Sequence, residues 1–139
     1  MNRNDSYLVI YAHRLVNRMD HLTADICREH GLTLSQFGVL EALYSKGDLP
    51  VGKVKDLVLS SDGTIPLIVR NLEKAGYIST KKDPADGRRK ILCLTDEGRA
   101  VVKPAIAENE KALAGELSDW SAEEKTRMIR VLRKHAVGF

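Results

Sequence analysis

The chain has 139 residues, of which 43% are hydrophobic and 29% are charged, ordinary values for a soluble globular protein with one modest core. Its net charge of +3 permits nucleic-acid binding without requiring it. No apolar run reaches the ~18 residues that a membrane helix needs, and the N-terminal segment lacks the apolar core of a signal peptide. We therefore expect one domain over residues 1–139, located in the cytoplasm and without a membrane partner.

The first part of the chain predicts two helices. Apolar residues recur at steps of three and four from about Asp5 to His30, which is typical of a long amphipathic helix. Its stripe consists of Leu8, Tyr11, Ala12, Leu15, Met19, Leu22 and Ile26. Thr33 and Gln36 then fit a capping box at the start of a second helix. The core stripe of that helix is predicted to be Phe37, Leu40, Leu43 and Tyr44, and residues 45–50 are predicted to form a loop.

Two shorter helices are predicted next, on either side of a turn at Ser60 to Gly63. Val54, Leu57 and Val58 give the first of them, from about Val51 to Leu59, a single apolar stripe. The second helix has a predicted buried stripe of Ile65, Ile68, Val69 and Leu72, and Gly76 suits its C′ position. This arrangement indicates a helix-turn-helix.

A basic hairpin is predicted to follow the second short helix. Residues 77–81 and 91–95 are rich in β-formers, and Pro84 and Gly87 supply turn residues between them. The segment from Lys81 to Lys90 contains five basic and two acidic residues. A hairpin with a basic tip directly after a helix-turn-helix is the order of a winged helix-turn-helix, a DNA-binding unit.

The remainder of the chain predicts two more helices. Thr95 suits the N-cap of a helix that runs to about Leu117, and Pro104 inside it predicts a kink near residues 100–103. Ser121 and Glu124 fit a second capping box. The apolar stripe of the last helix is predicted to be Met128, Ile129, Leu132 and His135.

The wing carries a family resemblance. Asp86-x-Arg88, followed by Leu92-x-Leu94-Thr95-x-x-Gly98, resembles the wing signature of the multiple-antibiotic-resistance regulator (MarR) family of bacterial transcription factors. The segments LEALYSKGDLPVGKVKDLVLSS and VRNLEKAGYI are similar to the supporting and recognition helices of that family, and the similarity covers nearly the whole chain.

This resemblance implies a mainly α fold with a small β wing. It places a DNA-binding lobe over residues 33–98 and dimerisation helices over residues 5–30 and 99–139. It further implies a homodimeric repressor that binds an inverted-repeat operator in double-stranded DNA and is released by a ligand or an oxidant.

Candidate DNA-contacting residues lie on both short helices and on the wing. Lys53, Lys55, Lys74 and Lys82 are expected to contact phosphates, whereas Thr64, Leu67, Arg70, Asn71 and Arg88 are expected to provide specificity. Ser61, Pro66, Asp86, Arg89 and Lys90 complete the set. We expect Asp86 to hold the Arg88 side chain extended. Because Pro66 is tolerated only in the first helical turn, the helix should begin at Asp62 or Gly63, or be distorted there.

Two hypotheses address how the protein is controlled. Tyr11, Arg14, Phe37 and Tyr44 are candidates for binding a small aromatic or phenolic effector, although aromatics at helical spacing are more often plain core. Cys27 is a candidate thiol sensor because the neighbouring Arg28 favours a thiolate; the competing interpretation is a buried, inert cysteine. The histidines of the first helix are spaced too widely to build a metal site, so no metal or other cofactor is predicted.

The sequence also bears on two other classes of function. An enzyme needs converging catalytic groups, and the sequence shows neither a catalytic motif nor a phosphate-binding glycine loop. A winged-helix module that binds protein instead of DNA stays open, because a fold does not fix a function. The basic tip formed by Arg88, Arg89 and Lys90 favours DNA.

Overall fold

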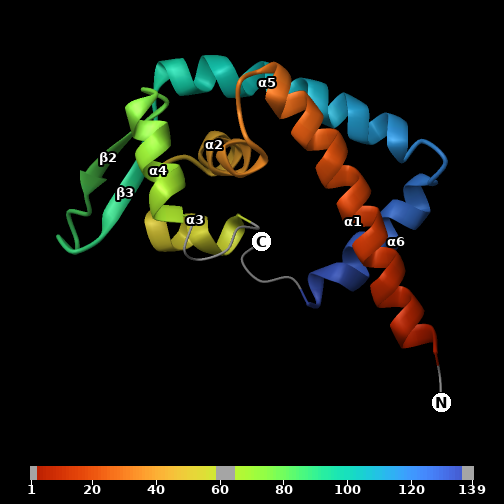
Figure 1. The fold of residues 1–139 in the computed structure, drawn as a ribbon. Helices are drawn as coiled ribbons and strands as arrows, with labels where there is room; N and C mark the ends of the chain where they lie inside the picture. The colour runs from red at the N-terminus through yellow and green to blue at the C-terminus, as the bar shows by residue number, and fades with distance from the viewer. Residues whose placement is uncertain (1–2, 59–64, 136–139) are drawn as a thin grey trace.

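The computed structural model describes residues 3–58 and 65–135, a mainly helical fold with one small antiparallel sheet (Figure 1). The helices are α1 (Asn4–Glu29), α2 (Leu34–Lys46), α3 (Val51–Leu57), α4 (Ile65–Lys74), α5 (Asp96–Glu116) and α6 (Ala122–Arg133). The strands are β1 (Leu49–Pro50), β2 (Ile78–Lys82) and β3 (Lys90–Leu94). Every predicted helix and the predicted hairpin are present. Within the described ranges, no helix combines the length and apolarity needed to cross a membrane.

The sheet corrects one prediction. Its strand order is β1-β3-β2, and β1 lies within the segment 45–50 that was predicted to be a loop. Leu49 pairs with Leu92, and Pro50 pairs with Ile91. Proline is accepted there because β1 is an edge strand, where one backbone N–H is not needed for the ladder. Through this pairing, the segment before α3 is hydrogen-bonded to β3, the central strand of the sheet.

The hydrophobic core lies in the lobe that contains α2, α3, α4 and the sheet. The predicted stripe of α4 is buried in full, and it packs with residues from α2, α3, β3 and α5. The largest fully buried side chains are Leu40, Leu43, Ile65, Leu72, Leu92, Val39, Val54, Val102 and Cys27. Figure 1 shows α5 running from this lobe towards the region where α1 and α6 lie.

The end of α4, the wing and the start of α5 meet at one tight junction. Gly76 follows α4 with a φ of +81°, as expected of a C′ glycine. The Thr95 hydroxyl donates to the Gly76 carbonyl oxygen at 2.7 Å and accepts the Gly98 N–H at 3.0 Å. The Thr95 N–H donates to the Tyr77 carbonyl oxygen at 3.1 Å. A Cβ at Gly98 would lie 2.1 Å from that same oxygen, so only glycine fits.

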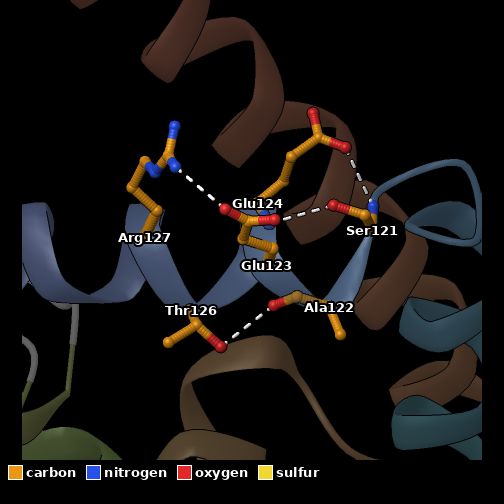
Figure 2. A network of polar contacts seen from close by, with 6 residues as sticks. All are labelled: Ser121, Ala122, Glu123, Glu124, Thr126 and Arg127. Carbon is orange, nitrogen blue, oxygen red and sulfur yellow. Dashed lines mark hydrogen bonds and ion pairs between the residues drawn. The ribbon is translucent and has the colours of Figure 1, made fainter.

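Capping residues fix where the other helices begin. Thr33 and Gln36 form the predicted capping box of α2, and Ser121 and Glu124 form that of α6. Figure 2 shows the second box, in which the Glu124 carboxylate accepts the Ser121 N–H and the Ser121 hydroxyl accepts the Glu124 N–H, both at 3.0 Å. The hydrogen bond from the Ser121 N–H lowers the pKa of Glu124. α5 continues as one helix through Pro104, and the kink there stays a prediction.

Polar contacts join α1 to α5. The Thr23 hydroxyl donates to the Asn109 side-chain oxygen at 2.7 Å, and both residues are buried. His30 contacts Glu108 at 3.0 Å, and a further ion pair joins Arg18 to Glu116. A buried hydrogen-bonded pair is satisfied in one register only, because a shifted helix would leave both polar groups without a partner. These contacts therefore fix how α1 lies on α5.

The other end of the molecule exposes apolar side chains. The first half of α1 leaves Tyr7, Leu8, Val9, Ile10, Tyr11, Leu15 and Val16 in solvent, and α6 does the same with Met128, Ile129, Val131 and Leu132. α6 has no buried residue in the single chain. A surface cleft of about 520 Å³ lies between these helices, lined by Leu8, Trp120, Met128 and Val131 among others. Apolar surface on this scale is typical of an interaction site.

The junction at Gly98 leads to a stability prediction. Replacing Gly98 by alanine would place a methyl carbon against the Tyr77 carbonyl oxygen and the Leu94 side chain, so the backbones must separate. We expect Gly98→Ala to lower the free energy of unfolding by at least about 2 kcal/mol in a urea titration followed by circular dichroism.

Gly115→Ala is the matched control, because Gly115 lies in the same helix and a Cβ there meets no atom within 4 Å. This control should gain about 0.5–1 kcal/mol from the higher helix propensity of alanine. Equal stability of Gly98→Ala and the wild-type protein would contradict the tight junction.

Candidate nucleic-acid interface

α4 presents a polar surface opposite its buried stripe. Leu67, Arg70, Asn71 and Lys74 are spaced at i, i+3, i+4 and i+7, and all four are exposed. Pro66, beside Leu67, is exposed as well. The structure therefore brings the predicted reading residues of this helix onto one face. Ser61, Thr64 and the predicted helix start at Asp62 or Gly63 lie outside the described residues.

The wing projects a second group of cations. Lys82, Arg88, Arg89 and Lys90 are all exposed at the ends of β2 and β3 and on the loop between them. Arg88, Arg89 and Lys90 also line a cleft of about 400 Å³ together with Pro50, Val51 and Gly52 from the start of α3. Lys53 and Lys55 are exposed on α3 itself. Figure 1 shows α3, α4 and the hairpin in one lobe of the molecule, away from α6.

The contacts of Asp86 differ from the prediction. Its carboxylate oxygen Oδ1 accepts the backbone N–H of Arg88 at 3.1 Å, and no ion pair joins it to the Arg88 guanidinium among the residues that the structure describes. The expectation that Asp86 holds the Arg88 side chain is therefore wrong. A carboxylate two residues before an N–H is placed for this local turn.

The base of the wing contains an ion pair that the sequence did not reveal. The Lys81 ammonium lies 3.4 Å from the Asp48 carboxylate, which links β2 to the residue just before β1. The two side chains are half exposed, so the pair contributes little stability by itself. Its partners are 33 positions apart, and only the pairing of β1 with β3 brings them together.

The four candidate effector residues do not form one site within a single chain. Phe37 is buried in the core, whereas Tyr44 is partly buried and its ring lies 5.2 Å from the Arg99 guanidinium. Tyr11 is 62% exposed, near Tyr7 and Arg14. Because an α-helix rises ~1.5 Å per residue, Tyr11 lies roughly 24 Å along α1 from the part of that helix that enters the core.

Comparison with known proteins decides the family. The sequence profile described as transcriptional regulator SarA/Rot, a winged-helix regulator family, matches residues 21–104. The HTH-type transcriptional regulator MhqR of Bacillus subtilis (strain 168) is 30% identical over 123 residues, which cover 88% of this chain and 83% of that protein. The chain belongs to the MarR-like winged-helix transcription regulators. It is a DNA-binding regulator, and the proteins it resembles are regulators, not enzymes.

Solved structures agree with this MarR-like fold. A putative MarR-like transcription regulator from Bacillus cereus ATCC 10987 has a TM-score of 0.79 at 19% identity and covers 96% of each chain. NadR in complex with 4-hydroxyphenylacetate has a TM-score of 0.83 at 20% identity, with 92% of this chain and 91% of that chain covered. Bordetella bronchiseptica BpsR, whose DNA binding is regulated by 6-hydroxynicotinic acid, has a TM-score of 0.71 at 24% identity, with coverages of 90% and 92%. These likenesses establish the mainly α architecture with its small wing.

The cysteines of this MarR-like regulator do not show the chemistry expected of a sensor. Cys27 is fully buried, and burial raises its pKa to about 11, with a smaller contribution from the Glu41 carboxylate. The expectation that Arg28 favours the thiolate is wrong, because the Arg28 guanidinium is exposed and pairs with Asp25 at 3.2 Å. Burial also raises the pKa of Cys93, with the Asp48 carboxylate acting in the same direction.

A thiol-modification experiment follows from the burial of Cys27. With a pKa of about 11, only about 0.1% of this thiol is ionised at pH 8, and the thiolate is the reactive form. In a Cys93→Ser variant, we expect iodoacetamide to leave Cys27 unmodified in the folded protein and to label it fully in urea. Rapid labelling of Cys27 in the folded variant, followed by mass spectrometry, would contradict its burial.

Proposed function

We propose that this regulator is a homodimeric repressor that binds an inverted-repeat operator and is released by a small aromatic or phenolic effector. The observation that carries the proposal is the exposed face of α4, which lies in the same lobe as the basic wing. A helix of this kind enters the major groove, and a two-fold dimer places two such helices in successive grooves.

The proposed DNA contacts divide by chemistry. Arg70 and Asn71 offer hydrogen bonds to base edges, whereas the apolar Leu67 side chain suits the methyl group of thymine. Lys53, Lys55, Lys74, Lys82, Arg89 and Lys90 would contact phosphates, Ser61 would add a further polar DNA contact, and Thr64 would contribute to specificity with Arg70 and Asn71. Pro66 would lie against a thymine methyl or a sugar. Arg88 at the wing tip suits a narrow minor groove, where the negative potential is enhanced.

The exposed apolar faces of α1 and α6 support the dimer. Leu8, Leu15, Ile129 and Leu132 are among the large side chains that a single chain leaves in water. Burying a leucine or isoleucine side chain contributes about 1.5–3 kcal/mol, so a second copy of the chain would stabilise both helices. The dimerisation regions proposed on this basis are residues 5–30 and 99–139, and the DNA-binding lobe is residues 33–98.

An aromatic effector is proposed from the chemistry of two ring-and-guanidinium pairs. Arg14 lies 5.9 Å from the Tyr11 ring on α1, and Arg99 lies 5.2 Å from the Tyr44 ring between α5 and α2. Either pair offers a flat surface for an aromatic ring and a cation for a carboxylate. The effectors named for NadR and BpsR, 4-hydroxyphenylacetate and 6-hydroxynicotinic acid, are therefore the first compounds to test.

A DNA-binding titration tests the proposal. Operator DNA is selected from random sequence by the purified protein, and its affinity is measured by fluorescence anisotropy at several salt concentrations with scrambled DNA as competitor. We expect sequence-selective binding that weakens with salt, since phosphate contacts release counterions. Lys74→Ala should lower the salt slope by about 1, whereas Arg70→Ala should weaken selected DNA by about 1–3 kcal/mol and scrambled DNA much less.

The same titration discriminates between the alternatives. Equal, weak binding of selected and scrambled DNA would contradict the operator proposal and favour a winged-helix module that binds protein. Adding 4-hydroxyphenylacetate or 6-hydroxynicotinate to the DNA complex should lower the anisotropy if either compound releases the operator. The Arg14→Ala and Arg99→Ala variants then show which ring-and-guanidinium pair binds the effector.

The dimer is tested separately by sedimentation velocity. We expect the wild-type protein to sediment as a dimer and Leu132→Lys to shift towards the monomer, because a charge would enter the apolar face of α6. Leu132 is 55% exposed in the single chain, so this change does not disturb the core. Ala85→Lys, on the exposed wing tip, adds the same charge at a distance from α6 and should remain dimeric. A dimeric Leu132→Lys protein would locate the interface elsewhere.

A further inference from the structure

Two carboxylates stand among the cations of the wing tip. Asp83 and Asp86 lie between Lys82 and Arg88, in the segment that the proposed function places against DNA. A negative charge near phosphates opposes binding, since like charges repel even when salt screens them. Such residues need a compensating role if the wing contacts DNA.

Both carboxylates accept hydrogen bonds within the tip. The Asp83 carboxylate oxygen Oδ1 accepts the Ala85 N–H at 2.9 Å, and the Asp86 Oδ1 accepts the Arg88 N–H at 3.1 Å. Both are bonds from a side chain to the backbone two residues ahead, the pattern by which Asp and Asn stabilise turns.

The backbone of the tip closes over the same residues. The Asp83 N–H donates to the Arg89 carbonyl oxygen at 2.9 Å, and the Arg89 N–H donates to the Asp86 carbonyl oxygen at 3.0 Å. The N–H groups of Arg88 and Arg89 therefore both donate to acceptors within the loop. The loop backbone therefore makes these hydrogen bonds in the structure without DNA, while the Arg88 and Arg89 side chains remain exposed.

We propose that Asp86 is a positioning residue that acts on DNA binding through the backbone of Arg88, without touching DNA and without pairing with a guanidinium. Ordering the tip in advance removes part of the entropy loss that Arg88 would otherwise suffer on entering a groove. This inference rests on the proposed contact of Arg88 with DNA. The proposal assigns opposite effects to the two properties of Asp86. The acceptor oxygen favours DNA binding, whereas the negative charge of the carboxylate opposes DNA binding.

A pair of substitutions separates these two effects. Asp86→Asn keeps an Oδ1 acceptor for the Arg88 N–H but removes the charge, whereas Asp86→Ala removes both. The charge is therefore the same in the two variants, and any difference between them reports on the hydrogen bond. We expect Asp86→Asn to bind selected DNA at least as tightly as the wild-type protein, and Asp86→Ala to bind about fivefold more weakly than Asp86→Asn.

Two further measurements show whether the effect passes through Arg88. In a background of Arg88→Ala, the difference in DNA affinity between Asp86→Ala and Asp86→Asn should disappear, because coupled residues give non-additive effects. Hydrogen exchange in the DNA-free protein should be faster at the residue 88 amide of Asp86→Ala than in Asp86→Asn. This exchange reading does not depend on DNA binding.

Specific results would overturn the inference. If Asp86→Asn loses as much affinity as Asp86→Ala, the charge of Asp86 supports binding, as in a pairing with the Arg88 guanidinium. A difference that persists in the Arg88→Ala background would place the action of Asp86 elsewhere. If the wild-type protein binds no DNA selectively, the operator proposal fails together with this one; if the wild-type protein binds and the two Asp86 variants are equal, only the positioning role fails.

Discussion

The close contact between the Tyr77 carbonyl oxygen and Gly98 constrains how the elements of the winged-helix lobe pack. At this point the connection between α4 and β2, the end of β3 and the start of α5 touch with no room for a methyl group. Thr95 adds hydrogen bonds to the two backbone segments on either side. A displacement of any one of these elements must therefore carry the other two with it, because close-packed contacts transmit motion and do not absorb it. These contacts couple α4 and the wing to the start of α5.

The two helices outside this lobe, α1 and α6, differ in how firmly they are attached to the remainder of the chain. α1 is fixed to α5 by the buried pair of Thr23 and Asn109 and by two exposed ion pairs. α6 has good local signals, including its capping box and the ion pair of Glu123 with Arg127 shown in Figure 2, but it buries no residue. Capping and surface ion pairs contribute only about 1 kcal/mol each, which is too little to hold a helix of this length. Within the described residues, the buried core therefore lies in the lobe, whereas the exposed faces of α1 and α6 are where the proposed dimer would add contacts.

Local patterns in the sequence were enough for most of the architecture. The buried stripe of α4 and both capping boxes follow from spacing alone, because helix period and N-cap chemistry depend on near neighbours. β1 was missed because two residues, one of them proline, carry no alternation of apolar and polar residues. Its existence depends on β3, which lies some 40 positions further along the chain.

Candidate site residues were harder to predict because their roles depend on surroundings that the sequence does not display. Arg28 is adjacent to Cys27 in sequence, but on a helix the two side chains point in different directions, and burial by other elements sets the pKa of the thiol. The spacing of Asp86 and Arg88 indicates that the two residues interact, and they do. The turn, however, places the backbone N–H of Arg88 against the carboxylate, and not the guanidinium. Tyr11 and Phe37 share an aromatic character but are separated by most of the length of α1.

Because α5 is long, a small change of its angle at one end produces a larger displacement at the junction with the wing. The 21 residues of α5 span about 31 Å at ~1.5 Å per residue, from the wing to the region where α1 and α6 lie. If α5 moves without bending at Pro104, a tilt of about six degrees about its far end moves its near end by about 3 Å, close to the ~3.4 Å between successive bases along a DNA strand. If α4 and the wing contact DNA as proposed, a rearrangement of this size where α1 meets α5 would displace both contacts by about one base step.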